Sequence, residues 1–332
     1  MALKLMKAIA SRLKPLLRWV ILGACLFFLA AVLKQNWESV TMIRITEAGW
    51  ACLIMALGVT LYAHIVAGWV WGWILRRDFQ QLVPWAWIIQ AYLQTNIAKY
   101  LPGNIWHYYG RVQAATQAGA SLEAATVSVL LEPLLMAAAA LLVAVFSSQA
   151  IVSQYGFLSL LLHWLILVGI LLALHPKVLN LLIRKLAKAK QKATPVLKSV
   201  PTPVSLNHYP WMALLGELGF LLLRGGGFLL TFQVLSSFTL SQVPVLFSAF
   251  SLAWLLGLVV PGAPGGMGVF EATVISLLGR EFPSGLLLGV VALYRLVSVA
   301  SEALGAGLGW LDQQRDRNWH GARGTGQETF SD

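Results

Sequence analysis

Six long apolar runs, spread over most of the 332-residue chain, constrain its fold more than any other feature. Crossing the hydrocarbon core of a bilayer takes about 20 apolar residues in a helix. Because 58% of the residues are hydrophobic and only 11% are charged, the composition excludes an ordinary water-soluble globular fold. We therefore expect an all-α polytopic integral membrane protein with six full transmembrane helices, at residues 19–33, 49–75, 124–146, 157–174, 211–235 and 284–310.

Two further apolar segments, 84–120 and 243–279, are each broken in the middle. The first break begins at Pro102 and the second at Pro261, and glycines follow both prolines. Proline removes a backbone donor and clashes with the preceding turn, and glycine adds backbone freedom, so neither segment can be one continuous helix. We expect two re-entrant broken helices, although two kinked but complete helices are the alternative.

The net charge of +11 is concentrated beside apolar runs, in residues 1–18 and 175–210, which carry basic residues and no acid. This placement indicates membrane topology and excludes a nucleic-acid footprint. With both broken segments re-entrant, 18 Lys and Arg lie on the side of the N-terminus and three on the other side. The positive-inside rule then predicts that both termini lie in the cytoplasm.

One transmembrane domain is predicted over residues 19–310, between the basic N-terminus and a polar cytoplasmic tail at 311–332. Its halves, 19–146 and 157–310, each contain two helices, a broken segment and a third helix. The halves start on opposite sides, so they form an inverted repeat. Inverted repeats with interrupted helices occur in secondary transporters, where the interruptions meet at the substrate site.

The two cysteines, Cys25 and Cys52, lie in apolar runs without the spacing of a metal site or a CxxC motif. The chain also lacks a phosphate-binding loop of the P-loop type and a Ser/His/Asp set. We expect no cofactor, no metal and no catalytic residue.

Three stretches resemble the transmembrane region of the lysylphosphatidylglycerol synthase family, which is also called flippase-like. They are LPGNIWHYYGR at 101–111, VVPGAPGGMGVFEATVISLLG at 259–279 and ALYRLVSVASE at 292–302. The likeness covers about 19–310, and its most specific part is PGxxGGxGxxE. The resemblance implies a bacterial-type inner-membrane protein with two re-entrant segments, related to the module that moves aminoacylated phosphatidylglycerol between leaflets. Bifunctional family members continue into a soluble lysine-transferring domain, whereas only the short tail follows here, so we expect no synthase activity.

Four charged residues fall inside the last two apolar runs. Glu217 and Arg224 are seven positions apart, as are Arg295 and Glu302, so each pair lies on one helix face. Both arginines fall near the middle of their runs, where an ionised side chain needs a partner or a polar cavity. One reading is two diagonal ion pairs, Arg224 with Glu302 and Arg295 with Glu217. The other is a site for a lipid phosphate, held by both arginines and by N–H groups where helices restart after the breaks.

The remaining candidates for headgroup binding gather at the two breaks. They are Lys99, Asn104, His107, Tyr108 and Arg111 at the first break, and Gly262, Gly265, Gly266 and Glu271 at the second. Lys99 and Arg111 could instead extend toward lipid headgroups. Glu271 could select a cationic headgroup or, as we expect, pair with an arginine.

Glu132, Glu217 and Glu302 are candidates for ion coupling or ion pairing. Glu132 precedes Pro133, so it could carry a proton or be a hydrogen-bonded residue at a kink. His64 and His163 are isolated on apolar runs, and we expect them to be hydrogen-bonded packing residues and not ligands.

The sequence favours a lipid flippase or transporter for an anionic phospholipid or lipid-linked product. A membrane-embedded headgroup transferase is one alternative. A non-catalytic subunit that recruits a partner enzyme through the loop 175–210 is another, although this loop could also bind anionic headgroups or only set the topology. Membrane lipids are the expected partners, and a homo-oligomer is compatible with this reading.

Overall fold

The computed structural model describes residues 45–101, 105–146, 148–181, 205–260 and 264–324. Within these ranges the chain forms helices and short connections and no strand, which confirms the predicted all-α class. The basic N-terminus and the predicted first run at 19–33 lie outside the described residues, as do 182–204 of the basic loop.

Six helical segments in the described ranges are long and apolar enough to cross a membrane. They are Glu47–Asp78, Leu122–Val145, Gly156–Ala173, Trp211–Leu235, Leu240–Val259 and Ser284–Arg315. Five of them match predicted runs. The sixth, Leu240–Val259, was assigned to a re-entrant segment, and it reaches spanning length because the turn η3 (Leu240–Gln242) precedes the helix α10 (Val243–Val259).

The first broken segment folds into a hairpin of two short helices, α4 (Trp85–Asn96) and α5 (Trp106–Gln117). The helix α4 starts after Pro84 and tightens into the 3₁₀ turn η2 (Ile97–Tyr100) just before the break. Each helix has 12 residues and therefore rises only about 18 Å, too little to cross the hydrocarbon alone. The two helices pack against each other, so the chain turns back at the break.

The second broken segment also forms a hairpin, in which α10 packs against the 10-residue helix α11 (Val269–Leu278). The turn η4 (Pro264–Gly266) begins its return. Gly265, Gly266 and Gly268 have φ of 59°, 72° and 77°, a left-handed region that favours glycine. The glycines that broke the sequence pattern are therefore the residues that allow the turn.

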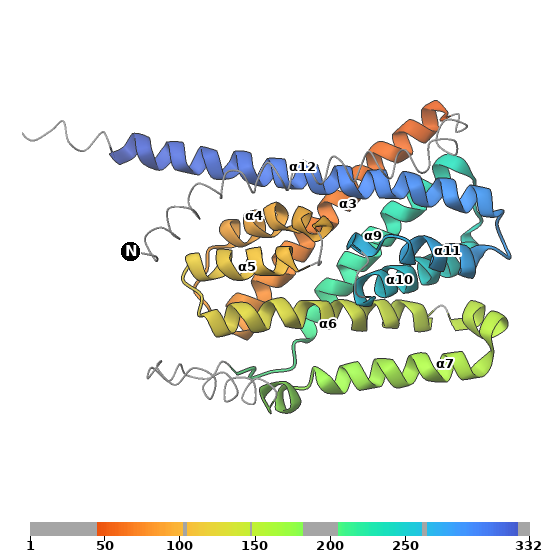
Figure 1. Ribbon diagram of the computed structural model, residues 1–332, viewed down its shortest axis with the longest axis horizontal. Helices are drawn as coiled ribbons and strands as arrows, with labels where there is room; N and C mark the ends of the chain where they lie inside the picture. The colour runs from red at the N-terminus through yellow and green to blue at the C-terminus, as the bar shows by residue number, and fades with distance from the viewer. Residues whose placement is uncertain (1–44, 102–104, 147, 182–204, 261–263, 325–332) are drawn as a thin grey trace, which may run out of the picture.

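Long helices enclose both hairpins (Figure 1). On one side runs α12 (Ser284–Gly324), which packs against α3 (Glu47–Trp73), α4, α9 (Trp211–Leu235) and α11. On the other side lies α6 (Leu122–Phe146), which packs against α5, α9, α10 and the outer helix α7 (Ser148–Ala173). The helix α12 passes beyond residue 310, so no structural boundary separates the predicted last span from the start of the tail.

The helices α3 and α9 make the most extensive helix contact among the described residues, because small residues let them approach. A Cβ atom added at Gly216 would lie 2.4 Å from Val70 Cγ2, and one at Gly227 would lie 2.4 Å from Thr60 Oγ1. Close approach through glycine is typical of membrane helix pairs. This contact brings the polar residues of α3 and α9 together in the interior.

Candidate functional site

The two hairpins meet at their tips, where η2 contacts η4. A Cβ atom at Gly265 would lie 2.5 Å from Tyr100 Cε1, and one at Gly257 would lie 3.1 Å from the Cα of Gly266. A side chain at Gly265 would push the two tips apart, and one at Gly257 would push α10 away from the turn of its own hairpin. Two breaks from opposite halves of the sequence are thus adjacent in space.

A cavity of about 120 Å³ lies beside the tips, enough for several waters or a group the size of a phosphate. It is lined from both hairpins and from α3, α6, α9 and α12. Many of the residues predicted to bind a headgroup line it: Lys99, His107, Tyr108, Arg111, Arg224, Gly265, Gly266 and Arg295. Asn104 and Gly262 lie outside the described residues.

Arg295 joins α12 to the tip of the second hairpin. Its Nε lies 2.8 Å from Glu271 Oε1, and its Nη1 and Nη2 donate to the carbonyl oxygens of Gly265 and Gly266 at 2.6 and 2.9 Å. These carbonyls belong to the break, where helical partners are lost. Glu271 therefore pairs with an arginine, the alternative that the sequence favoured over a cationic headgroup.

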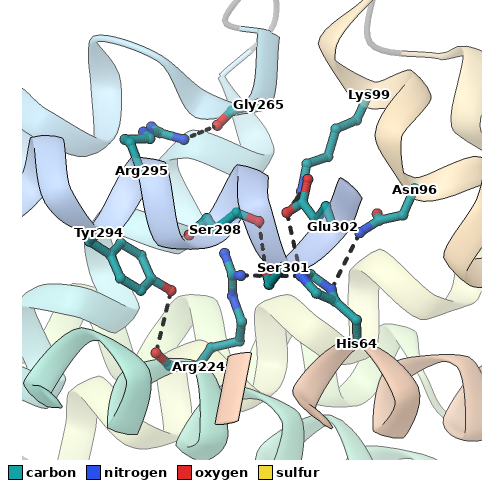
Figure 2. Close-up of polar contacts among 10 residues, drawn as sticks. All are labelled: His64, Asn96, Lys99, Arg224, Gly265, Tyr294, Arg295, Ser298, Ser301 and Glu302. Atoms are coloured by element: carbon teal, nitrogen blue, oxygen red, sulfur yellow. Dashed lines mark hydrogen bonds and ion pairs between the residues drawn. The ribbon is translucent and has the colours of Figure 1, made fainter. Parts of the chain in front are cut away.

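Glu302, seven residues after Arg295 on α12, is buried and lies between Lys99 and His64 (Figure 2). Its Oε1 lies 2.6 Å from Lys99 Nζ and 3.4 Å from His64 Nε2. The other ring nitrogen of His64 lies 3.3 Å from Asn96 Nδ2. This group connects the first hairpin to α3 and α12.

His64 is buried with three polar partners, as expected of a hydrogen-bonded packing residue, but it also lines the cavity, which the sequence did not predict. A signal was present in the sequence: Thr60, His64 and Gly68 recur every four residues on one face of an otherwise apolar helix. Stripes of small and polar residues mark the faces on which membrane helices associate. His163, by contrast, lies on α7 and does not line the cavity.

Arg224 has no carboxylate within ion-pair distance in the described part of the chain. Its Nη1 lies 3.3 Å from His64 Nε2, its guanidinium lies 5.5 Å from the centre of the Tyr294 ring, and its buried Nε has no hydrogen-bond partner. The Tyr294 hydroxyl donates to the Arg224 carbonyl oxygen at 3.3 Å (Figure 2).

The two diagonal ion pairs considered from the sequence do not form between the described helices. Arg295 binds Glu271 instead of Glu217, and Glu302 binds Lys99 instead of Arg224. The reason is that η2 of the first hairpin brings Lys99 to Glu302, and α11 of the second hairpin brings Glu271 to Arg295, so each charge on α12 has another partner of opposite charge.

A second buried group lies on the α5 and α6 side of the cavity. Arg111 Nη1 lies 2.6 Å from Glu132 Oε2, and its guanidinium lies 3.7 Å from the centre of the Tyr92 ring. The Arg111 side chain is 3% exposed, so it does not extend toward lipid headgroups. His107, also in this wall, has its ring centre 3.8 Å from that of Tyr108.

The arrangement suits an anion more than a metal. Four cations line one cavity, namely Lys99, Arg111, Arg224 and Arg295, and only Arg224 lacks a carboxylate among the described residues. Arginine matches the planar geometry of phosphate oxygens. Within the described ranges no group of three His, Cys, Asp or Glu side chains could hold a metal ion.

Comparison with known families agrees with the motifs at the two breaks. A family model described as the lysylphosphatidylglycerol synthase TM region matches residues 16–305, which include both hairpins and every described residue of the cavity wall. No curated protein matches the chain. This multi-pass membrane protein therefore belongs to the lysylphosphatidylglycerol synthase TM region family.

Proposed function

We propose that this chain moves an anionic phospholipid, or a lipid-linked product that carries a phosphate, between the leaflets of a bacterial inner membrane. Family membership supports a lipid-related role in the membrane. The cavity beside the hairpin tips supports the more specific proposal, because its wall presents cations that could bind an anionic headgroup among helices long and apolar enough to cross a membrane.

Arg224 is the observation that carries the proposal. Holding an ionised arginine inside a membrane protein is costly unless a partner stabilises it. Among the described residues Arg224 contacts a histidine nitrogen and an aromatic ring but forms no ion pair with a carboxylate. A phosphate in the cavity would supply the missing negative charge and accept several charge-assisted hydrogen bonds. The other three cations would strengthen the attraction although each already has a carboxylate.

The two hairpins supply a route for alternating access. We propose that they enter the bilayer from opposite sides, with both chain termini in the cytoplasm as the positive-inside rule favours. Their tips touch through Gly265 and the Tyr100 ring. Displacement of one tip relative to the other would open the cavity toward one leaflet or the other.

Reconstitution tests the proposal. The purified chain in liposomes should accelerate transbilayer movement of fluorescent phosphatidylglycerol, measured by a membrane-impermeant quencher. Arg224→Ala should lower the protein-dependent rate about tenfold or more, because a charge-assisted hydrogen bond to phosphate is lost, and Arg224→Lys should be intermediate. Arg280→Ala, which changes an exposed arginine, is the matched control. Equal rates for the wild type and Arg224→Ala would overturn the proposal.

A further inference from the structure

Glu217 of α9 is fully buried, and neither of its carboxylate oxygens has a hydrogen-bond partner among the described residues. It does not line the cavity, but Phe220, one turn further along α9, does. Burial of an ionised carboxylate without donors is among the most costly arrangements in a protein interior. The side chain therefore needs either a donor or a proton.

The charged groups that act on Glu217 are Glu132 of α6 and Arg111 of α5. Tyr92 of α4 also faces it. Three other helices pack against α9, and α10 carries no titratable residue. The helix α3 contributes His64 and α12 contributes Glu302, and these two side chains contact each other. Glu302 also binds Lys99, and His64 also contacts Arg224.

The local charges do not balance when both carboxylates are ionised. Arg111 supplies one positive charge and donates to Glu132 at 2.6 Å, and Glu132 also accepts from the Tyr92 hydroxyl. Glu217 receives no donor in the described structure. Two neighbouring carboxylates disfavour ionisation of both, so one proton neutralises the group.

We infer that Glu217 and Glu132 form a proton-binding site beside Arg111, in which Glu217 carries the proton while Glu132 stays ionised against the guanidinium. The site is built from three helices, and two of its members, Arg111 and Glu132, also line the cavity. A proton can therefore reach it from cavity water through Glu132.

This site couples the movement of the lipid to the uptake and release of a proton, a role that rests on the proposed function. An anionic headgroup in the cavity competes with Glu132 for Arg111. As Arg111 turns to the phosphate, Glu132 loses its cation and takes a proton from a hydronium ion of the cavity, which leaves water behind. The lipid charge and the proton then move together, and release of the lipid returns Arg111 to Glu132 and frees the proton.

Infrared spectroscopy of the full chain in lipid nanodiscs tests the proton directly. At neutral pH, the wild type should show the carbonyl band of a protonated carboxyl group, shifted in D₂O, and Glu217→Gln should lose it. Glu281→Gln, which changes an exposed acid, should keep the band. A wild-type minus Glu217→Gln difference spectrum with only the bands of an ionised carboxylate would overturn the inference.

A second variant covers a failure of Glu217→Gln to fold. Glu217→Asp retains a protonatable group, so its carbonyl band should persist at a shifted frequency. Replacing a neutral acid by an amide of the same shape should leave the melting temperature of Glu217→Gln near that of the wild type, whereas Glu132→Gln should lower it because Arg111 loses its carboxylate. The opposite order of stabilities would count against the assignment of the proton to Glu217.

The transport readout separates this inference from the proposed function. Wild-type lipid movement should change with pH. Glu217→Gln, which mimics the protonated acid, should keep that dependence, whereas Glu132→Gln should lose it. A carboxyl band that Glu217→Gln removes, together with no lipid movement by the wild type, would retain the proton site and overturn the proposed function. Lipid movement that depends on Arg224, without such a band, would do the reverse.

Discussion

Gly265, at the tip of the second hairpin, lies directly against the ring of Tyr100, at the tip of the first. The contact joins the tips of the two broken segments, and both residues line the cavity. Gly265 has a positive φ, and the Tyr100 ring leaves no space for a Cβ atom. The backbone conformation and the neighbouring ring therefore both require glycine at this position.

Gly265→Ala should destabilise the protein through both effects. A left-handed conformation costs a non-glycine residue about 1–2 kcal/mol, and the added Cβ would lie 2.5 Å from Tyr100 Cε1. The expected result is a lower melting temperature in detergent, followed by intrinsic tryptophan fluorescence. Adding Tyr100→Ala should relieve the clash but not the backbone strain, so recovery should be partial. A single variant as stable as the wild type would contradict this account of the tip.

Arg295→Met should loosen the tip of the second hairpin. The substitution removes the guanidinium that donates hydrogen bonds to the carbonyl oxygens of Gly265 and Gly266 and that pairs with Glu271. Hydrogen–deuterium exchange measured by mass spectrometry should rise in peptides covering α11, while Arg280→Met should leave these peptides unchanged. Unaltered exchange in α11 would show that other contacts hold the tip.

Lys99 and Glu302 should be energetically coupled. Lys99→Met leaves a buried carboxylate with only His64, and Glu302→Gln leaves the lysine without its anion, so each single change should cost about 3–5 kcal/mol. The double variant should be more stable than the sum of the two changes predicts. Thermal unfolding of all four proteins measures the coupling. As a comparison, Lys99→Met with Glu271→Gln should be additive.

Gly216→Ala should weaken the contact between α3 and α9. The new Cβ would lie 2.4 Å from Val70 Cγ2, and overpacking of this kind costs about 1–3 kcal/mol. Combination with Val70→Ala should restore part of the loss. Gly219→Ala is the matched control on the same helix, because nothing lies within 4 Å of its added Cβ, and it should be neutral or stabilising. Equal melting temperatures for Gly216→Ala and Gly219→Ala would rule out this explanation of the close approach.

Much of the fold could be predicted because apolar length and backbone chemistry are local properties. Five predicted runs coincide with long apolar helices, and in both broken segments the described helices stop before the break, at Tyr100 and Val259, and a helix starts again after it, at Trp106 and Val269. The extent of the helical segment that contains α10 could not be predicted, because the capped turn Leu240–Gln242 precedes the apolar run that starts at Val243 and lengthens the segment.

The sequence by itself determined the membrane class, the positions of both breaks and the identity of the buried charges. Only the tertiary structure decided which charges pair. Partner choice depends on the rotation and depth of each helix, and two hairpin tips from distant parts of the chain bring Lys99 to Glu302 and Glu271 to Arg295. The same packing gives His64 its polar partners and leaves Arg224 without a carboxylate in the described structure, because Glu302 of the neighbouring α12 binds Lys99 and His64 instead.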